Sequence, residues 1–136
     1  MFDINQKITE KQARLMNPVV LAYIGDCVHT LYVRQKLAFS SDAKSGELNK
    51  REAKIVCATA QASALNNILP LLTEEEHAIF RRARNSKKNS RAKTASLTEY
   101  AKSTGFEAVM GYLYVTGQTE RINELLFKAE NTPQGE

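Results

Sequence analysis

The chain has 136 residues, enough for one domain whose hydrophobic core needs neither disulfide bonds nor structural metal ions. Its 43% apolar and 25% charged residues and its net charge of +4 are ordinary for a soluble globular protein. No apolar run approaches membrane-spanning length, and the first 17 residues lack the basic-then-apolar pattern of a signal peptide, so we expect neither a membrane nor a secreted protein.

Two cysteines, Cys27 and Cys57, lie among apolar residues and lack the spacing of metal ligands. We therefore expect two buried thiols in helices and a reducing compartment, the cytoplasm. The pattern predicts one domain over residues 1–130 and a flexible tail over residues 131–136.

The first half of the chain predicts three helices. Thr9 suits the N-cap of a short helix within residues 1–16, and Pro18 suits the first turn of a long helix over residues 17–37. A polar loop at residues 38–44 precedes a second long helix over residues 45–67. That helix carries an outward basic strip, which is either a solvated face or a nucleic-acid contact: Lys50, Arg51 and Lys54.

The long helix over residues 17–37 has two apolar stripes, and Asp26 lies on one of them. The first stripe is expected to form a core face: Val20, Ile24, Val28 and Leu31. Asp26 shares the second stripe, a candidate interface, with these residues: Val19, Ala22, Tyr23, Thr30 and Val33. An ionised carboxylate in apolar surroundings is costly unless it is neutralised, so Asp26 faces either water or a cation. The helix alone leaves both interpretations open.

A basic segment follows the next predicted helix. Thr73 and Glu76 form a capping-box sequence that starts this helix, and its basic last turn suits the helix dipole. Seven basic residues and no acidic residue lie between residues 81 and 93, which leaves 12 basic against 15 acidic residues elsewhere. We expect residues 85–93 to form a loop that binds phosphates, although such a loop can also be merely solvated.

The last third of the chain predicts two more helices, the first ending at Gly117 and the second over residues 119–130. The run from Ser103 to Gly105 is a candidate break within the first of them. Glu107 resembles Asp26, because it is an isolated acidic residue within an apolar helix. No stretch alternates like a strand, so the fold class is expected to be all-α.

Small residues flank both acidic residues and would allow their helices to pack closely: Ala22, Gly25, Ala108 and Gly111. If the helices touch, the carboxylates of Asp26 and Glu107 would repel each other unless they bind a cation. Mg²⁺ is suitable, since it takes one or two carboxylates and recruits phosphate oxygens. Spacing alone does not establish that the helices touch.

Three motifs, in order, resemble the ribonuclease III family. Leu21–Val28 resembles its signature helix, residues 45–56 resemble the helix that follows, and Phe106–Tyr114 resembles its second acidic motif. The Mini-III branch, whose members consist of the nuclease domain alone, is closer still. It shares Ala-Tyr-Ile-Gly-Asp, the Glu-Glu-Glu helix running into Arg-Asn-x-Lys, and the segment here at residues 103–108.

This resemblance implies a ribonuclease III catalytic-domain-like helical bundle that works as a homodimer. After such a domain, too little chain is expected to remain for a double-stranded-RNA-binding domain. It implies Mg²⁺-dependent cleavage of double-stranded RNA, leaving 5′-phosphate and 3′-hydroxyl ends, with Asp26 and Glu107 as catalytic, metal-binding carboxylates. The branch is associated with maturation of the large ribosomal RNA precursor in bacteria. The implied RNA-binding residues are Arg82, Arg84, Lys87, Lys88, Arg91 and Lys93.

Two positions depart from the pattern of larger ribonucleases III. Where these carry a Glu four residues before the Asp and an Asp three before the second Glu, this chain has Ala22 and Thr104. We therefore expect one firmly placed Mg²⁺ rather than two. Two alternatives remain: a non-catalytic duplex-RNA or ribosome-binding protein, and a helical adaptor whose basic loop is only solvated.

Overall fold

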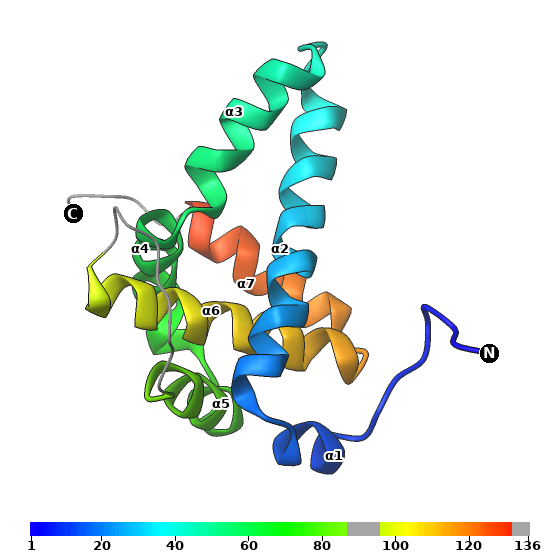
Figure 1. The fold of residues 1–136 in the computed structure, drawn as a ribbon, viewed down its shortest axis with the longest axis vertical. Helices are drawn as coiled ribbons and strands as arrows, with labels where there is room; N and C mark the ends of the chain where they lie inside the picture. The colour runs from blue at the N-terminus through cyan, green and yellow to red at the C-terminus, as the bar shows by residue number, and fades with distance from the viewer. Residues whose placement is uncertain (87–95, 132–136) are drawn as a thin grey trace.

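The computed structural model describes residues 1–86 and 96–131, and the expected loop residues 87–95 and most of the expected tail lie outside this range. Within it every regular element is helical, which confirms the expected all-α fold (Figure 1). The elements are α1 (Glu10–Leu15), α2 (Pro18–Ser40), α3 (Ser45–Val56), α4 (Ala58–Ile68), the 3₁₀ turn η1 (Leu69–Leu71), α5 (Glu74–Arg84), α6 (Leu97–Val115) and α7 (Thr119–Asn131). None of the described helices is both long and apolar enough to cross a lipid bilayer.

Helix α6 is the centre of the fold, and α2, α4 and α5 pack around it (Figure 1). Its crossing with α2 is a direct backbone contact. A Cβ atom added to Gly25 would lie 1.6 Å from the carbonyl oxygen of Glu107, and one added to Gly111 would lie 1.9 Å from that of Leu21. The sequence-based expectation that small residues allow these two helices to touch is therefore confirmed.

The predicted core face of α2 is wrong at Val20 and Leu31, although Val28 of the same stripe packs against the core. Val20 is 44% exposed and Leu31 is 57% exposed. The buried face consists of Leu21, Ala22, Gly25, His29 and Val33. The physical reason is the glycine contact, because α2 must turn its smallest residues toward α6 and thereby leaves larger apolar residues outside.

The predicted single helix over residues 45–67 is broken at Cys57, whose extended backbone separates α3 from α4. The prediction of two buried thiols is also wrong, since Cys27 and Cys57 are both exposed. Cys27 lies outside the buried face of α2, and Cys57 lies in the exposed joint between two helices.

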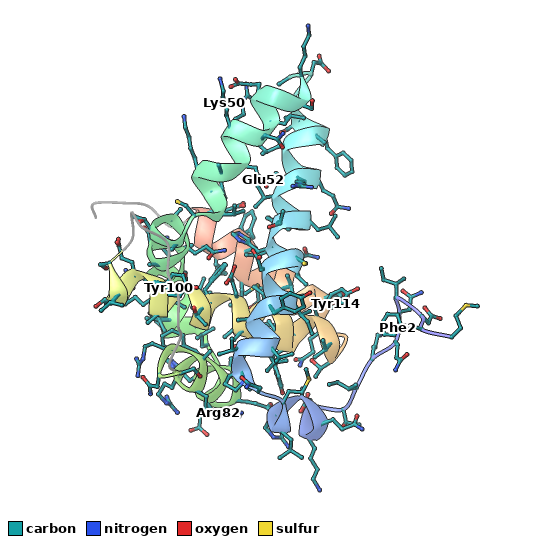
Figure 2. The ribbon with its side chains drawn as sticks, in the orientation of Figure 1. Phe2, Lys50, Glu52, Arg82, Tyr100 and Tyr114 are labelled. Atoms are coloured by element: carbon teal, nitrogen blue, oxygen red, sulfur yellow. The ribbon has the colours of Figure 1, made fainter. Side chains whose placement is uncertain are left out.

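Helix α3 and the second half of α2 project together from the rest of the protein (Figure 1). No residue of α3 is buried, and Glu52 holds it to α2 through an ion pair with Arg34. Figure 2 shows Glu52 between the two helices and Lys50 on the outer side of α3. The basic strip of α3 is exposed, as expected.

Helix α6 continues through the candidate break at residues 103–105. Gly105 instead makes room for α5, since a Cβ atom there would lie 2.4 Å from Cδ1 of Phe80. The expected end at Gly117 is confirmed: Gly117 has φ +78°, and the N–H of Gln118 donates to the carbonyl oxygen of Leu113 at 2.8 Å. This pattern is a Schellman motif, in which glycine is favoured at the left-handed position.

Capping boxes fix three of the helix starts. The predicted caps Thr9 and Thr73 each form a complete capping box, and Ser96 forms a third. The box at Thr73 uses Glu76, which also receives two hydrogen bonds from the guanidinium of Arg121, at 2.9 and 2.8 Å. The ion pair of Glu76 and Arg121 therefore links the start of α5 to α7.

Candidate active site

Asp26 and Glu107 both lie at the α2–α6 crossing, one on each helix. Asp26 follows the contact residue Gly25, and Glu107 supplies the backbone carbonyl that Gly25 faces. The side chain of Asp26 is exposed and that of Glu107 is half-buried. A cation arriving from solvent therefore has access to both helices at this crossing.

The side chain of Glu107 has a buried neighbour on α4. Nε2 of Gln61 donates to Oε2 of Glu107 at 3.4 Å and contacts Nδ1 of His29 at 3.0 Å. Burial lowers the pKa of His29 to about 4, against weaker opposing effects of Glu130 and Asp26. His29 is therefore neutral at pH 7, and its Nδ1 accepts the hydrogen bond from Gln61.

The sequence interpretation assigned no role to Gln61 or His29. His29 has no second histidine or cysteine at ligand spacing, and Gln61 lies in a run of small residues. A usable signal existed in the helical spacing: His29 follows Asp26 by three residues and therefore lies beside it on the helix.

The two departures from the pattern of larger ribonucleases III supply no metal ligand. Ala22 and Thr104 are both buried, and the hydroxyl of Thr104 donates to the carbonyl oxygen of Tyr100 at 3.1 Å. Among the described residues, no group of three or more His, Cys, Asp and Glu side chains is placed to enclose a metal ion. An open site with two carboxylates fits Mg²⁺, which keeps several waters, better than it fits Zn²⁺.

Two of the six expected RNA-binding residues are described, and both have contacts within the protein. The guanidinium of Arg82 donates to the carbonyl oxygens of Arg14 at 2.7 Å and Met16 at 3.3 Å, at the end of α1. Figure 2 shows Arg82 on α5 near α1. The guanidinium of Arg84 lies 5.2 Å from the ring centroid of Phe80. The other four lie outside the described residues: Lys87, Lys88, Arg91 and Lys93.

The outer face of α2 is apolar and exposed. Tyr23 is 76% exposed and lies near Val20 on this face, with Leu31 two turns further along. In contrast, Ala22 and Val33 of the expected interface stripe are buried within the protomer. Of the apolar residues of α2, Val20, Tyr23 and Leu31 therefore remain exposed on its outer face.

A model of the ribonuclease III domain matches residues 19–118, a segment that contains both Asp26 and Glu107. The chain belongs to the ribonuclease III family. The matched segment runs from the start of α2 to the end of α6, so the helices that make the central crossing are those of the family domain.

Curated relatives narrow the family to its Mini-ribonuclease 3 members. Mini-ribonuclease 3 of Symbiobacterium thermophilum is 44% identical over 109 residues, which cover 80% of this chain and 84% of that protein. The proteins of the same name from Clostridium tetani and Brevibacillus brevis are 39% and 40% identical, and the matches cover 90% and 93% of this chain and 82% and 94% of those proteins. The expected resemblance to the Mini-III branch is therefore confirmed.

A solved structure supports the fold independently. The crystal structure of a protein from Fusobacterium nucleatum superposes with a TM-score of 0.76 at 28% sequence identity, covering 84% of this chain and 91% of that one. Together with the domain match, it confirms the expected ribonuclease III-like helical bundle.

Proposed function

We propose that this chain is a Mg²⁺-dependent endoribonuclease that hydrolyses double-stranded RNA, with Asp26 and Glu107 as the metal-binding catalytic carboxylates. The observation that carries this proposal is the glycine contact between α2 and α6, which brings both acidic residues to one crossing inside the segment matched by the ribonuclease III domain. The names of the curated relatives support the same activity.

Asp26 and Glu107 would hold the metal ion, and the remaining positions would go to water and an RNA phosphate because Ala22 and Thr104 offer no ligand. Bound Mg²⁺ would polarise the phosphate and lower the pKa of the attacking water. The protein contributes the separation of the two helices, set by Gly25 and Gly111, and with it the spacing of the two carboxylates. The proposed products carry 5′-phosphate and 3′-hydroxyl ends.

RNA binding is assigned to the basic segment that begins in α5. Arg84 and the residues Lys87, Lys88, Arg91 and Lys93 would contact phosphates and read the A-form shape of a duplex rather than its bases. Arg82 belongs to the same proposal, although its hydrogen bonds to the end of α1 give it a structural role as well.

The working enzyme is proposed to be a homodimer that uses the Val20–Tyr23–Leu31 face of α2. A two-fold dimer presents two equivalent sites, which matches the two strands of an RNA duplex. The proposed substrate is the precursor of large-subunit ribosomal RNA in the bacterial cytoplasm. Two exposed thiols are compatible with such a reducing compartment.

A cleavage assay tests the catalytic assignment. Purified protein is incubated with duplex RNA in the presence of Mg²⁺ or EDTA, together with the variants Asp26→Asn and Glu107→Gln. We expect cleavage only with Mg²⁺, and loss of cleavage in both variants. The matched controls Asp42→Asn and Glu120→Gln remove exposed carboxylates away from the crossing and should cleave normally. Full activity in either site variant would refute its assignment.

A second candidate function is duplex-RNA binding without catalysis, which the missing carboxylates at Ala22 and Thr104 favour. It predicts salt-sensitive binding of duplex RNA and no cleavage with Mg²⁺, Mn²⁺ or Ca²⁺. Metal-dependent cleavage that disappears in Asp26→Asn would reject it.

A further inference from the structure

Two polar side chains are buried beside the proposed metal centre without an evident structural need. Gln61 of α4 is 2% exposed and His29 of α2 is 5% exposed. Burying a polar side chain is costly unless its hydrogen bonds are made, and apolar residues would fill the same space without that cost. The contact between Gln61 and His29 satisfies each group only in part.

The hydrogen atoms of Gln61 determine how this contact is oriented. The amide nitrogen carries two hydrogens, and the structure gives it two acceptors: Nδ1 of His29 at 3.0 Å and Oε2 of Glu107 at 3.4 Å. The reversed amide would place its oxygen against the carboxylate of Glu107, which is unfavourable. His29 must therefore carry its proton on Nε2.

The imidazole ring of His29 is itself fixed by α6. It packs edge-on against the ring of Phe106, with centroids 5.0 Å apart and an interplanar angle of 77°. Phe106 directly precedes Glu107, so α6 both orients His29 and presents the carboxylate that Gln61 binds. The three helices α2, α4 and α6 thus form one connected unit around Oε2 of Glu107.

We propose that Gln61 is a positioning residue for Glu107, and that His29 acts through Gln61. The inference rests on the proposed role of Glu107 as a metal ligand. By donating to Oε2, Gln61 restricts the rotamers of a flexible, half-buried side chain and holds its carboxylate ready for the cation. Outer partners of this kind typically affect metal affinity by about 10- to 100-fold.

A double substitution separates positioning from a merely structural role. In His29→Leu/Gln61→Leu the two buried polar partners are replaced together, so neither leaves the other unpaired. Glu107 loses the hydrogen bond from Gln61, but its side chain is only half-buried and keeps access to water, so the melting temperature should be preserved. We expect the affinity of the RNA-free protein for Mn²⁺, a paramagnetic substitute for Mg²⁺ followed by electron paramagnetic resonance, to fall about tenfold. Wild-type Mn²⁺ affinity in this variant would overturn the proposal.

The matched control lies on the same helix. Asn67 donates to the carbonyl oxygen of Ala129 at 2.9 Å, far along α4 from Glu107. Asn67→Leu should lower the melting temperature and leave Mn²⁺ affinity unchanged. If it weakened Mn²⁺ binding as much as the double substitution does, general destabilisation would explain both results and the positioning role would be rejected.

The single variants test whether His29 acts through Gln61. His29→Leu should weaken Mn²⁺ binding in the wild-type background but not in Gln61→Leu, because its effect requires the amide. His29→Asn keeps an acceptor on the same carbon position and should restore Mn²⁺ affinity to within about twofold. Nitrogen-15 NMR should show the Nε2–H tautomer of His29 at pH 7, and the opposite tautomer would contradict the hydrogen-bond scheme.

Glu107→Gln distinguishes failure of this inference from failure of the proposed function. If Glu107→Gln reduces Mn²⁺ affinity and the double substitution does not, the positioning role alone is wrong. If Glu107→Gln leaves Mn²⁺ affinity unchanged, Glu107 is not a metal ligand, and the proposed site is wrong together with the role of Gln61.

Discussion

Gly25 of α2 and Gly111 of α6 pack backbone against backbone, so that a Cβ atom on Gly111 would lie 3.0 Å from the amide nitrogen of Gly25. No side chain can enter this contact, and the two helices that carry Asp26 and Glu107 are as close as their backbones permit. The proposed catalytic geometry therefore depends on two residues that have no side chain.

The variant Gly25→Ala should lose both stability and cleavage. Its Cβ atom would meet the backbone of Glu107, which cannot rotate away, so the helices must separate. Overpacking of this kind lowers the free energy of unfolding by about 1–3 kcal/mol. Because the carboxylates are displaced, the activation free energy of cleavage should rise by at least as much. Urea unfolding and the duplex-RNA cleavage assay measure the two effects.

The control for this prediction is Gly46→Ala. No atom lies within 4 Å of a Cβ placed on Gly46, an exposed residue in the first turn of α3. Alanine should stabilise this helix by about 0.5–1 kcal/mol and leave cleavage unchanged. Equal behaviour of the two alanine variants would refute the role assigned to the contact.

Arg121→Met should be strongly destabilising. Glu76 is 3% exposed, and burial would raise the pKa of this carboxyl if the hydrogen bonds from Arg121 and Thr73 did not lower it overall. Removing the guanidinium leaves a buried charge unpaired, which costs about 3 kcal/mol or more. In thermal unfolding, the ion pair of Arg34 and Glu52 provides the comparison. The side chain of Arg34 is 62% exposed, so Arg34→Met should lower the melting temperature much less than Arg121→Met does.

The stability of the fold should fall between about pH 6.5 and pH 4 because of His29. Burial lowers the pKa of His29 to about 4, so in this range the unfolded chain binds a proton that the folded protein does not. Stability is therefore full above pH 6.5 and decreases on acidification, by up to about 3 kcal/mol. His29→Asn should remove this part of the slope in urea titrations at pH 7, 6 and 5, and an unchanged slope would contradict the prediction.

Tyr23→Glu should convert the proposed homodimer into a monomer. The side chain is 76% exposed on the apolar outer face of α2, where a charge at a subunit contact would be buried. Analytical ultracentrifugation measures the change in mass. Phe39→Glu is the control, since Phe39 is 84% exposed at the opposite end of α2, and its mass should equal that of the wild type.

Sequence reasoning predicted the parts of the fold that depend on local chemistry. The caps Thr9 and Thr73 and the left-handed Gly117 follow from hydrogen-bonding groups close to them in the chain. It failed at the buried face of α2. Hydrophobicity predicts that Leu31 is buried, whereas the backbone contact with α6 requires that Gly25 be buried instead. It also missed Gln61, whose importance arises only when three helices distant in sequence come together.

Helix α3 is the one described α-helix that buries none of its residues, and it should therefore be the first to unfold locally. Its hydrogen bonds are secured by few tertiary contacts, whereas those of α6 lie in the core. Amide hydrogens of α3 should therefore exchange with solvent through local fraying, while those of α6 should exchange only when the whole domain unfolds. The chain thus combines a rigid core around Gly25 and Gly111 with a helix, α3, that can open without unfolding the rest of the domain.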